Sequence, residues 1–347
     1  MTKKTQEKII PVLSVLIALV LGGIIMAVLG NDPIKAYIAL FEGAFIGKRH
    51  IAQTLIMATP LIFTGLAVAF AFQSGMFNIG AQGQIIVGGL VAVGIASFVD
   101  TPILNNVFVI VILAGAAGFA WAGIAGWLKA KLGVHEVIST IMLNYIAANI
   151  EQYMLNYPMK EGGITGPSPQ TPPISELSKL KSILPPTNLN VGFIIAILAA
   201  IAIWYILNKT VLGYEIKAIG FNKTASENAG INVNWKLVLA LGISGLLAGL
   251  GGAERVLGGI TQDRYIQGLM AEYGFDGIAV ALLGKNNPFG VIVAAILFGA
   301  LRAGAMRMQF VAGVPSQIII IIQAVIILLV ASENMFKMMF NKKKVKA

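Results

Sequence analysis

The fold is decided by a short apolar stretch, Gly274–Gly284, which reads GFDGIAVALLG. At about 1.5 Å rise per residue, a helix of this length covers roughly half of the hydrocarbon core of a membrane. Helices that stop at membrane depth usually line a cavity, because their freed backbone groups need water or protein partners. The stretch therefore predicts a polytopic membrane protein with an internal passage or site.

The composition of the whole chain indicates the same class. Of 347 residues, 57% are hydrophobic and 12% are charged, whereas soluble domains carry about a quarter charged residues. Cysteine is absent, which excludes disulfides and thiolate metal sites. The net charge of +10 comes from basic residues at segment ends that orient a membrane protein. The sequence shows no basic face with interleaved aromatic residues, so we do not expect it to bind nucleic acid.

Hydropathy predicts an all-α fold with about ten membrane spans, some of them broken or half-length. The spans are 9–30, 51–72, 79–98, 104–128, 137–157, 191–208, 235–257, 274–284, 288–306 and 316–333. The first apolar run is long and lacks a cleavage site, so we expect a retained helix rather than a signal peptide. With the N-terminus inside, the inner segments hold about twice as many Lys and Arg residues as the outer ones. Both termini are therefore predicted to be cytoplasmic.

The chain is predicted to form a single transmembrane domain, residues 1–347. Its cytoplasmic parts are a tail at 1–8, a loop at 209–234 and a basic tail at 334–347. A long loop at 158–190 is extracellular, and its Gly-Gly and Pro-Pro pairs resist regular structure.

Two glycine-rich breaks occupy similar places in two parts of the chain. They lie at 74–84 and 274–290, within the halves 51–157 and 235–333. This arrangement predicts two inverted repeats around a central site.

The first break, Ser74–Gln84, carries three amide side chains next to glycines and Phe77. Asn78, Gln82 and Gln84 cannot face lipid cheaply. The segment is either a broken helix that presents these amides to a translocation path or a polar cytoplasmic hairpin between two ordinary helices. The residues alone do not separate the two interpretations.

The inner loop contains the signals of a very short helix. Thr224 and Glu227 fit a capping box, and Gly230 fits a left-handed helix end. Such a helix is too short to be stable alone in water, so something must hold it. A groove on a partner protein would do so. Packing on its own membrane domain is the alternative, which the residues alone slightly favour.

The positions of ionisable residues near the spans limit which transport mechanisms fit the sequence. Glu151, Glu254, Arg255, Asp276 and Arg302 lie toward the predicted outer ends, and none falls near a span centre. Proton- or sodium-coupled carriers commonly place their coupling residues at the centre. Glu254 lies beside glycines near the outer opening, where it either lines a path or meets a partner or water. The chain carries no P-loop and no catalytic constellation, so we do not expect an enzyme.

Three segments, in order, resemble permeases of the branched-chain amino acid, ribose and nucleoside ABC importer family. They are Ser74–Gln84, Ala218–Ile231 and Phe275–Gly290, and the resemblance covers about residues 10 to 335. The residues around Asn78 are most similar to those of the nucleoside branch, whose members depend on a basic-membrane-protein type lipoprotein. Gln82 departs from the pattern, since many relatives carry glutamate there.

The resemblance implies a permease subunit of an ATP-driven importer in the cell membrane. It implies a coupling helix at 223–230 that docks into a separate ABC ATPase, which holds ATP and Mg²⁺, so this chain binds no cofactor. Further implied partners are a second, different permease, an extracellular substrate-binding lipoprotein, membrane lipid and a nucleoside substrate. A ribose-type sugar or a branched-chain amino acid is the alternative substrate, and a secondary carrier or a channel is the alternative class.

The resemblance and the residues together predict two sets of functional positions. The substrate path contains Phe77, Asn78, Gln82, Gln84 and Glu254. The ATPase-coupling surface contains Gly220, Asn222, Thr224, Ala225, Glu227, Ala229, Gly230 and Ile231.

Overall fold

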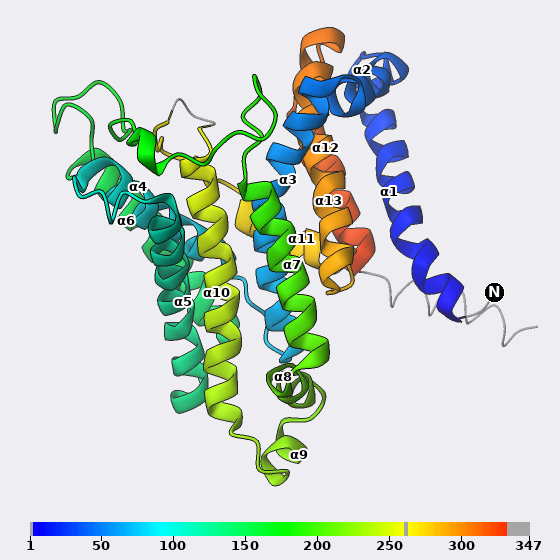
Figure 1. Ribbon diagram of the computed structural model, residues 1–347. Helices are drawn as coiled ribbons and strands as arrows, with labels where there is room; N and C mark the ends of the chain where they lie inside the picture. Colours follow the sequence, from blue (N-terminus) through cyan, green and yellow to red (C-terminus); the bar gives the residue numbers. More distant parts are fainter. Residues whose placement is uncertain (1–2, 260–262, 332–347) are drawn as a thin grey trace, which may run out of the picture. The chain divides into compact units, whose positions relative to one another are not determined.

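The computed structural model describes residues 3–259 and 263–331, and every regular element in this part of the chain is helical (Figure 1). The helices are α1 (Lys3–Val28), α2 (Pro33–Phe45), α3 (Lys48–Gln73), α4 (Ala81–Phe98), α5 (Val107–Leu132), α6 (Glu136–Asn156), α7 (Gly192–Lys209), α8 (Val211–Phe221), α9 (Lys223–Asn228), α10 (Val233–Leu257), α11 (Tyr273–Leu283), α12 (Pro288–Ala312) and α13 (Gln317–Ala331), with a 3₁₀ helix at Glu176–Ser178. The predicted all-α class is confirmed. The predicted basic tail at 334–347 lies outside the described residues.

Six of the described helices are long and apolar enough to cross a membrane, namely α3, α4, α5, α7, α10 and α12. The chain is therefore a polytopic membrane protein. The other four predicted spans fall on α1, α6, α11 and α13, which are helical but more polar or shorter in their apolar part. Ten crossings and inverted repeats stay predictions.

Two helices, α2 and α8, lie between the predicted spans, in the segments 31–50 and 209–234. The side chain of Asp32 caps α2 by accepting two backbone N–H groups, and Pro33 takes the first helical position. The hydroxyl of Thr210 caps α8 in the same way. Local caps of this kind satisfy the free N–H groups of a helix start, and they explain why 31–50 and 209–234 are partly helical.

The chain divides into two compact units. One combines the described residues of segments 1–57 and 296–347, and the other comprises the described residues of segment 58–295. In the first unit α1 packs against α13. The guanidinium of Arg307 pairs there with the carboxylate of Glu42 at 2.7 Å, which joins α12 to α2.

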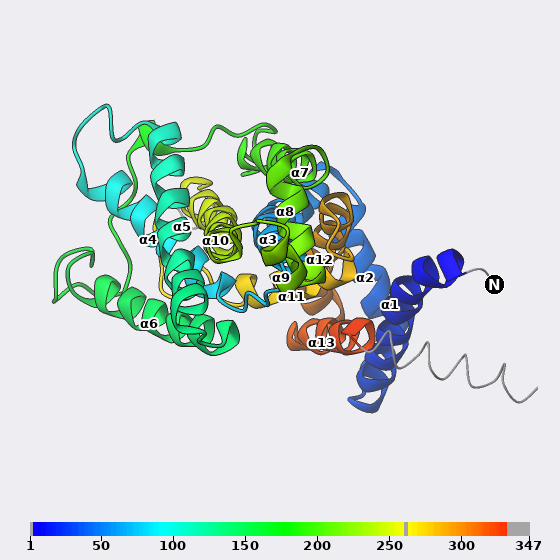
Figure 2. The same ribbon diagram turned by 90° about the horizontal axis from the view of Figure 1, so that it is seen from below.

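The second unit has a core of α4, α5 and α10, which lie side by side (Figure 2). A Cβ atom at Gly245 would lie 2.1 Å from the carbonyl oxygen of Gly118, and one at Gly88 would lie 2.5 Å from the Cα of Gly249. Only glycine permits such close backbone contact between helices. The glycines of α10 therefore serve helix packing.

The 158–190 loop and α9 lie at opposite ends of the second unit (Figure 1). Apart from its 3₁₀ turn, the loop is irregular, as its composition predicts. It is anchored by main-chain hydrogen bonds to the segment before α11: the N–H of Thr171 donates to the oxygen of Tyr265 at 3.0 Å, and that of Ile174 to the oxygen of Asp263 at 2.8 Å. The two ends thus carry separate surfaces.

Candidate functional site

The break between α3 and α4 is held by a buried amide cluster, formed by Asn78, Gln84, Ser244 and the backbone of Gly80. Asn78 is fully buried, and its Nδ2 donates to Gln84 Oε1 at 3.0 Å and to Ser244 Oγ at 2.7 Å. Gln84 Nε2 donates back to Asn78 Oδ1 at 3.1 Å, and the same oxygen accepts the N–H of Gly80 at 2.8 Å. Buried amides are costly unless hydrogen-bonded, so these contacts stabilise the break from within.

Gln82 joins the start of α4 to the start of α11. Its Nε2 donates to the carbonyl oxygen of Met270 at 2.8 Å, and its Oε1 accepts the N–H of Gly274 at 2.9 Å. The first N–H groups of a helix have no partner within the helix, and Gln82 supplies one for α11. A Cβ atom at Gly274 would lie 2.2 Å from the backbone of Gln82. Two helix N-termini therefore meet where only glycine fits.

Asn144 attaches α6 to the same point. Its Oδ1 accepts the N–H of Gly83 at 2.7 Å, and its Nδ2 donates to the carbonyl oxygen of Ile79 at 2.9 Å. These two backbone groups flank the first residues of α4. One side chain thus fixes the start of α4 against α6.

A cavity of about 480 Å³ opens where α4, α6 and α11 meet, and we call it the α4–α11 cavity. It is lined by Ile79, Gln82, Ile86, Ile141, Asn144, Tyr145, Ala148, Glu151, Gly268, Ala271 and Phe275. Small-molecule sites span about 300–1,000 Å³ and combine apolar walls with a few polar groups. The half-length helix therefore lines a cavity, as the sequence predicts, and this cavity has the size and chemistry of a solute site.

The structure separates the predicted path residues. Gln82 lines the α4–α11 cavity, whereas Asn78 and Gln84 belong to the buried amide cluster. Phe77 is half-buried and packs edge-on against Phe72, with the ring centroids 4.9 Å apart. A path role for Phe77, Asn78 and Gln84 stays a prediction.

Glu254 lies near the C-terminal end of α10 and is not among the residues that line the cavity. It is 3% exposed, and its Oε1 accepts a hydrogen bond from Asn190 Nδ2 at 3.1 Å. The neighbouring Arg255 lies over the ring of Tyr273, 4.9 Å from the centroid. A path role for Glu254 also stays a prediction.

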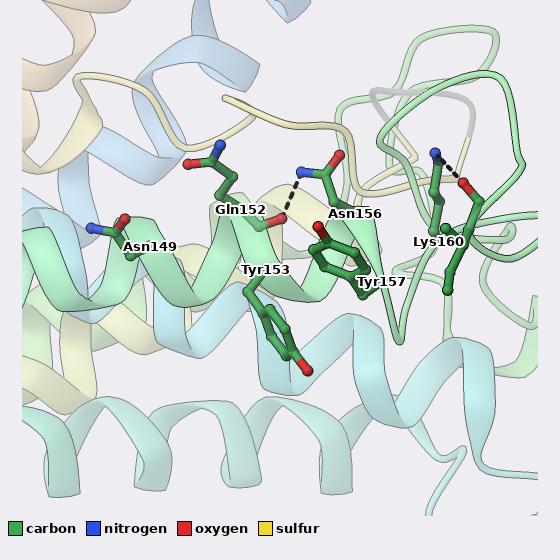
Figure 3. Close-up of a pocket in the computed structure, with 7 residues that line it drawn as sticks. Asn149, Gln152, Tyr153, Asn156, Tyr157 and Lys160 are labelled. Carbon is green, nitrogen blue, oxygen red and sulfur yellow. Dashed lines mark hydrogen bonds between the residues drawn. The ribbon is translucent and has the colours of Figure 1, made fainter.

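The accessible surface of α6 carries polar and aromatic residues, and we call Tyr145, Asn149, Gln152, Tyr153 and Asn156 together the α6 face. Tyr145 is 65% exposed and Tyr153 57% exposed. Two open hollows of about 540 Å³ and 480 Å³ lie along this helix. Figure 3 shows Gln152 and Asn156 on one side of the helix and Tyr153 on another. Because amides are costly against lipid, this face needs water or a protein partner.

Asn144 and the α6 face are not among the predicted functional residues, and Glu151 is predicted only as a charge near a span end. A usable signal is present in the spacing of Asn149, Gln152 and Asn156. Positions three and seven residues apart share one side of a helix. Amides repeated at this spacing within a predicted span therefore mark a side that avoids lipid.

The capping box predicted for the short helix of the 209–234 loop is wrong. Asn222 caps α9, and its Oδ1 accepts the N–H of Ala225 at 3.0 Å. Asn222 has the extended backbone of an N-cap, with φ −157°, whereas Thr224 is already inside the helix. Because Thr224 lies past the helix start, it and Glu227 do not form the cap.

The predicted left-handed end of this short helix is confirmed. Gly230 adopts φ +84°, and its N–H donates to the oxygen of Glu227 at 3.0 Å. The N–H of Ile231 donates to the oxygen of Ser226, also at 3.0 Å. This pair of hydrogen bonds is a Schellman motif, which satisfies the last carbonyls of a helix.

Most of α9 is exposed. Of its six residues, only Ser226 is buried, and Ala225 and Ala229 are both exposed. The preceding residue, Phe221, is 91% exposed. A short helix with an exposed aromatic beside it has the features of a docking surface rather than of a connector packed on its own domain.

The segment that leads into α9 touches the helix break. A Cβ atom at Gly220 would lie 2.2 Å from the carbonyl oxygen of Gln73, the last residue of α3, and Gly75 packs on the backbone of Gly220. The α9 end of the second unit is therefore in direct backbone contact with the segment that leads to the buried amide cluster.

The sequence matches, over residues 50–331, the family described as the permease component of branched-chain amino acid transport systems. The chain belongs to this permease family. It is accordingly a membrane transport subunit and not an enzyme. The resemblance given by its three sequence motifs is thereby confirmed.

The permease is similar to several relatives over all or nearly all of its length. It is 40% identical to the guanosine ABC transporter permease protein NupP of Bacillus subtilis, across 100% of this chain and 99% of the relative. It is 38% identical to the nucleoside ABC transporter permease protein NupB of Lactococcus lactis, across 99% and 96%. It is 34% identical to the glucose ABC transporter permease protein TsgB13 of Haloferax volcanii, across 94% and 88%. No solved structure shows significant similarity to the permease.

Proposed function

We propose that this permease carries nucleosides into the cell as the membrane subunit of an ATP-driven ABC importer. The observation that carries the proposal is the α4–α11 cavity, where buried polar groups lie beside Tyr145 and Phe275. A nucleoside has a flat base that stacks on aromatic rings and a ribose that forms hydrogen bonds. The names of the guanosine and nucleoside permease relatives support the same substrate class.

A sugar is the alternative substrate, because one full-length relative is a glucose permease. A sugar can bind the polar groups of the cavity, but it has no flat base to stack on the aromatic rings of the lining. A branched-chain amino acid, the substrate in the family description, lacks both a flat ring and hydroxyl groups. The cavity thus favours a nucleoside.

The exposed α9 supports ATP-driven coupling. In this proposal α9 docks into a separate ABC ATPase, which holds ATP and Mg²⁺. Closure of the ATPase moves α9 and α8, and the contact between Gly220 and Gly75 carries the motion to the helix break. The α4–α11 cavity lies just beyond that break, so access to it changes with the nucleotide state.

The α6 face supports a second permease as partner. We assign this face to a translocation path that the second permease, a different paralogue, closes from the other side. An extracellular lipoprotein delivers the solute at the 158–190 loop, at the end opposite to α9 (Figure 1). In this orientation α9 and both chain termini are cytoplasmic.

Uptake of labelled guanosine by cells that express the complete importer tests the proposal. We expect excess unlabelled guanosine to remove the signal, and equal concentrations of ribose, glucose or leucine to leave it. Competition by glucose would instead identify a sugar permease. Uptake that survives inactivation of the ATPase would identify a secondary carrier.

A further inference from the structure

Among the described residues that line the α4–α11 cavity, Glu151 is the one charged side chain. It is 8% exposed. We infer that Glu151 recognises the solute by accepting hydrogen bonds from the two neighbouring hydroxyl groups of a ribose. The inference deepens the proposed function and rests on it, since it names the part of the nucleoside that the cavity reads.

The other polar groups of the cavity are already occupied. Both ends of the Gln82 amide bind the backbone of the segment at the start of α11, and both ends of the Asn144 amide bind the backbone around the start of α4. A solute that bound either amide would have to displace a contact that holds a helix end. Glu151 is the buried polar group that retains capacity for a ligand.

The carboxylate of Glu151 is oriented but not saturated. Its Oε1 accepts the hydroxyl of Tyr265 at 2.7 Å, and the backbone N–H of Gly268 also donates to the carboxylate. A carboxylate offers about four acceptor positions. Two of these positions therefore remain for donors that a ligand supplies.

Vicinal hydroxyls fit such a carboxylate. Acidic side chains bind ribose hydroxyls in this way in dinucleotide sites. In the α4–α11 cavity the rings of Tyr145 and Phe275 belong to the same lining as Glu151. One solute can thus place its base against an aromatic ring while its ribose meets the carboxylate.

Tyr265 is a positioning residue in this arrangement. Its side chain is fully buried, and its backbone is tied to the 158–190 loop. Its carbonyl oxygen accepts the N–H of Thr171 at 3.0 Å, and its own N–H donates to Thr171 Oγ1 at 3.1 Å. The orientation of Glu151 is therefore linked to the surface proposed to meet the lipoprotein.

The test compares guanosine with 2′,3′-dideoxyguanosine in proteoliposomes that contain the complete importer. Both solutes are used at concentrations that saturate the lipoprotein, so the maximal uptake rate reports the permease. We expect the wild-type importer to carry guanosine about tenfold faster than the dideoxy analogue. In Glu151→Gln this ratio falls to about one to two, because a neutral amide replaces the charged acceptor. Asp100→Asn, which changes an exposed carboxylate, keeps the ratio at about ten, as in the wild type.

Tyr265→Phe provides a second test that keeps the ring and removes only its hydroxyl. We expect it to lower the ratio about threefold at an unchanged amount of assembled importer. An unchanged ratio in either variant, with guanosine uptake intact, would overturn this inference alone. A wild-type importer that carries no nucleoside would overturn the proposed function as well.

Discussion

The permease uses amide side chains in two opposite ways, in the buried amide cluster and on the α6 face. In the cluster, Asn78 is fully buried and each end of its amide is hydrogen-bonded within the protein. On the α6 face, Asn149 and Gln152 are exposed and border open hollows. The same residue types therefore belong to a closed scaffold in one place and to an incomplete surface in the other.

The difference lies in which partners complete the hydrogen bonds. The cluster draws its partners from α3, α4 and α10, since Ser244 Oγ in turn donates to the carbonyl oxygen of Ala67 at 2.6 Å. The α6 face bonds mainly to its own helix backbone, as when Asn156 donates to the oxygen of Gln152 at 2.7 Å (Figure 3). A closed network rigidifies a fold, whereas an open one awaits water, solute or another chain.

Asn78→Leu should produce the largest effect, because it removes the centre of the closed network. Gln84, Ser244 and the N–H of Gly80 would each lose the hydrogen bond to Asn78, at a cost of roughly 1–3 kcal/mol for each group left unsatisfied. That sum is a large part of a typical stability of about 5–15 kcal/mol. We expect little folded permease in the membrane and a lowered unfolding temperature of the purified complex. A variant with normal stability and an altered choice of solute would place Asn78 in the path instead.

Gly220→Ala should have the next largest effect. It tests whether the helix break beside the buried amide cluster responds to the ATPase. A methyl group at Gly220 would meet the carbonyl oxygen of Gln73 at 2.2 Å, so α8 must move away from the end of α3. We expect uptake to fall about tenfold while the complex still assembles and hydrolyses ATP. Gly123→Ala on α5 is the matched control, because nothing lies within 4 Å of its Cβ position. Equal uptake in both variants would remove Gly220 from the coupling route.

Asn149→Leu should reduce transport without reducing stability. Its amide is exposed, so its loss leaves no buried partner behind and stability changes by about 0.5 kcal/mol or less. We expect uptake to fall about fivefold, because an apolar side chain makes a wet path less favourable for a polar solute. Met142→Leu, an exposed apolar exchange on the same helix, should leave uptake unchanged. Lost membrane insertion in Asn149→Leu would show that the two amide regions do not differ in kind.

Much of the fold follows from hydropathy, because lipid imposes long apolar runs on the helices that cross it. The predicted half-length span, 274–284, agrees with α11 to within one residue at each end. Hydropathy does not predict the helices α2 and α8. They are short, and side-chain caps from Asp32 and Thr210 define their starts, which a hydropathy window does not register.

The site is harder to predict because its partners are distant in sequence. Asn78 and Gln82 look equivalent in a glycine-rich segment. Ser244, 166 positions from Asn78, makes Asn78 part of the scaffold, whereas Gly274, 192 positions from Gln82, brings Gln82 to the cavity. Local choices can fail as well: Asn222 and Thr224 both suit an N-cap, and only the backbone conformation selects Asn222.

The smallest effect is expected at the 158–190 loop, where a half-buried carboxylate, Glu161, makes the contacts. Glu161 Oε2 accepts Gln170 Nε2 at 2.8 Å and pairs with Arg264, and these contacts hold the pKa of Glu161 below its usual value. A lowered pKa means that the contact is fully present above the ordinary carboxyl pKa of about 4.3 and is lost as the pH falls through the lowered value.

Hydrogen exchange of the 158–190 loop measures this effect, after correction for the intrinsic exchange rates. We expect constant protection from about pH 7 to pH 5 and weaker protection below about pH 4. Glu161→Gln should show the weaker protection throughout, with no step on acidification, whereas Asp100→Asn should behave as the wild type. Because the Glu161 side chain is still about one-third exposed to solvent, its contact should affect the loop alone and leave the unfolding temperature of the complex unchanged. A global loss of stability in Glu161→Gln would mean that the 158–190 loop belongs to the same closed scaffold as the buried amide cluster.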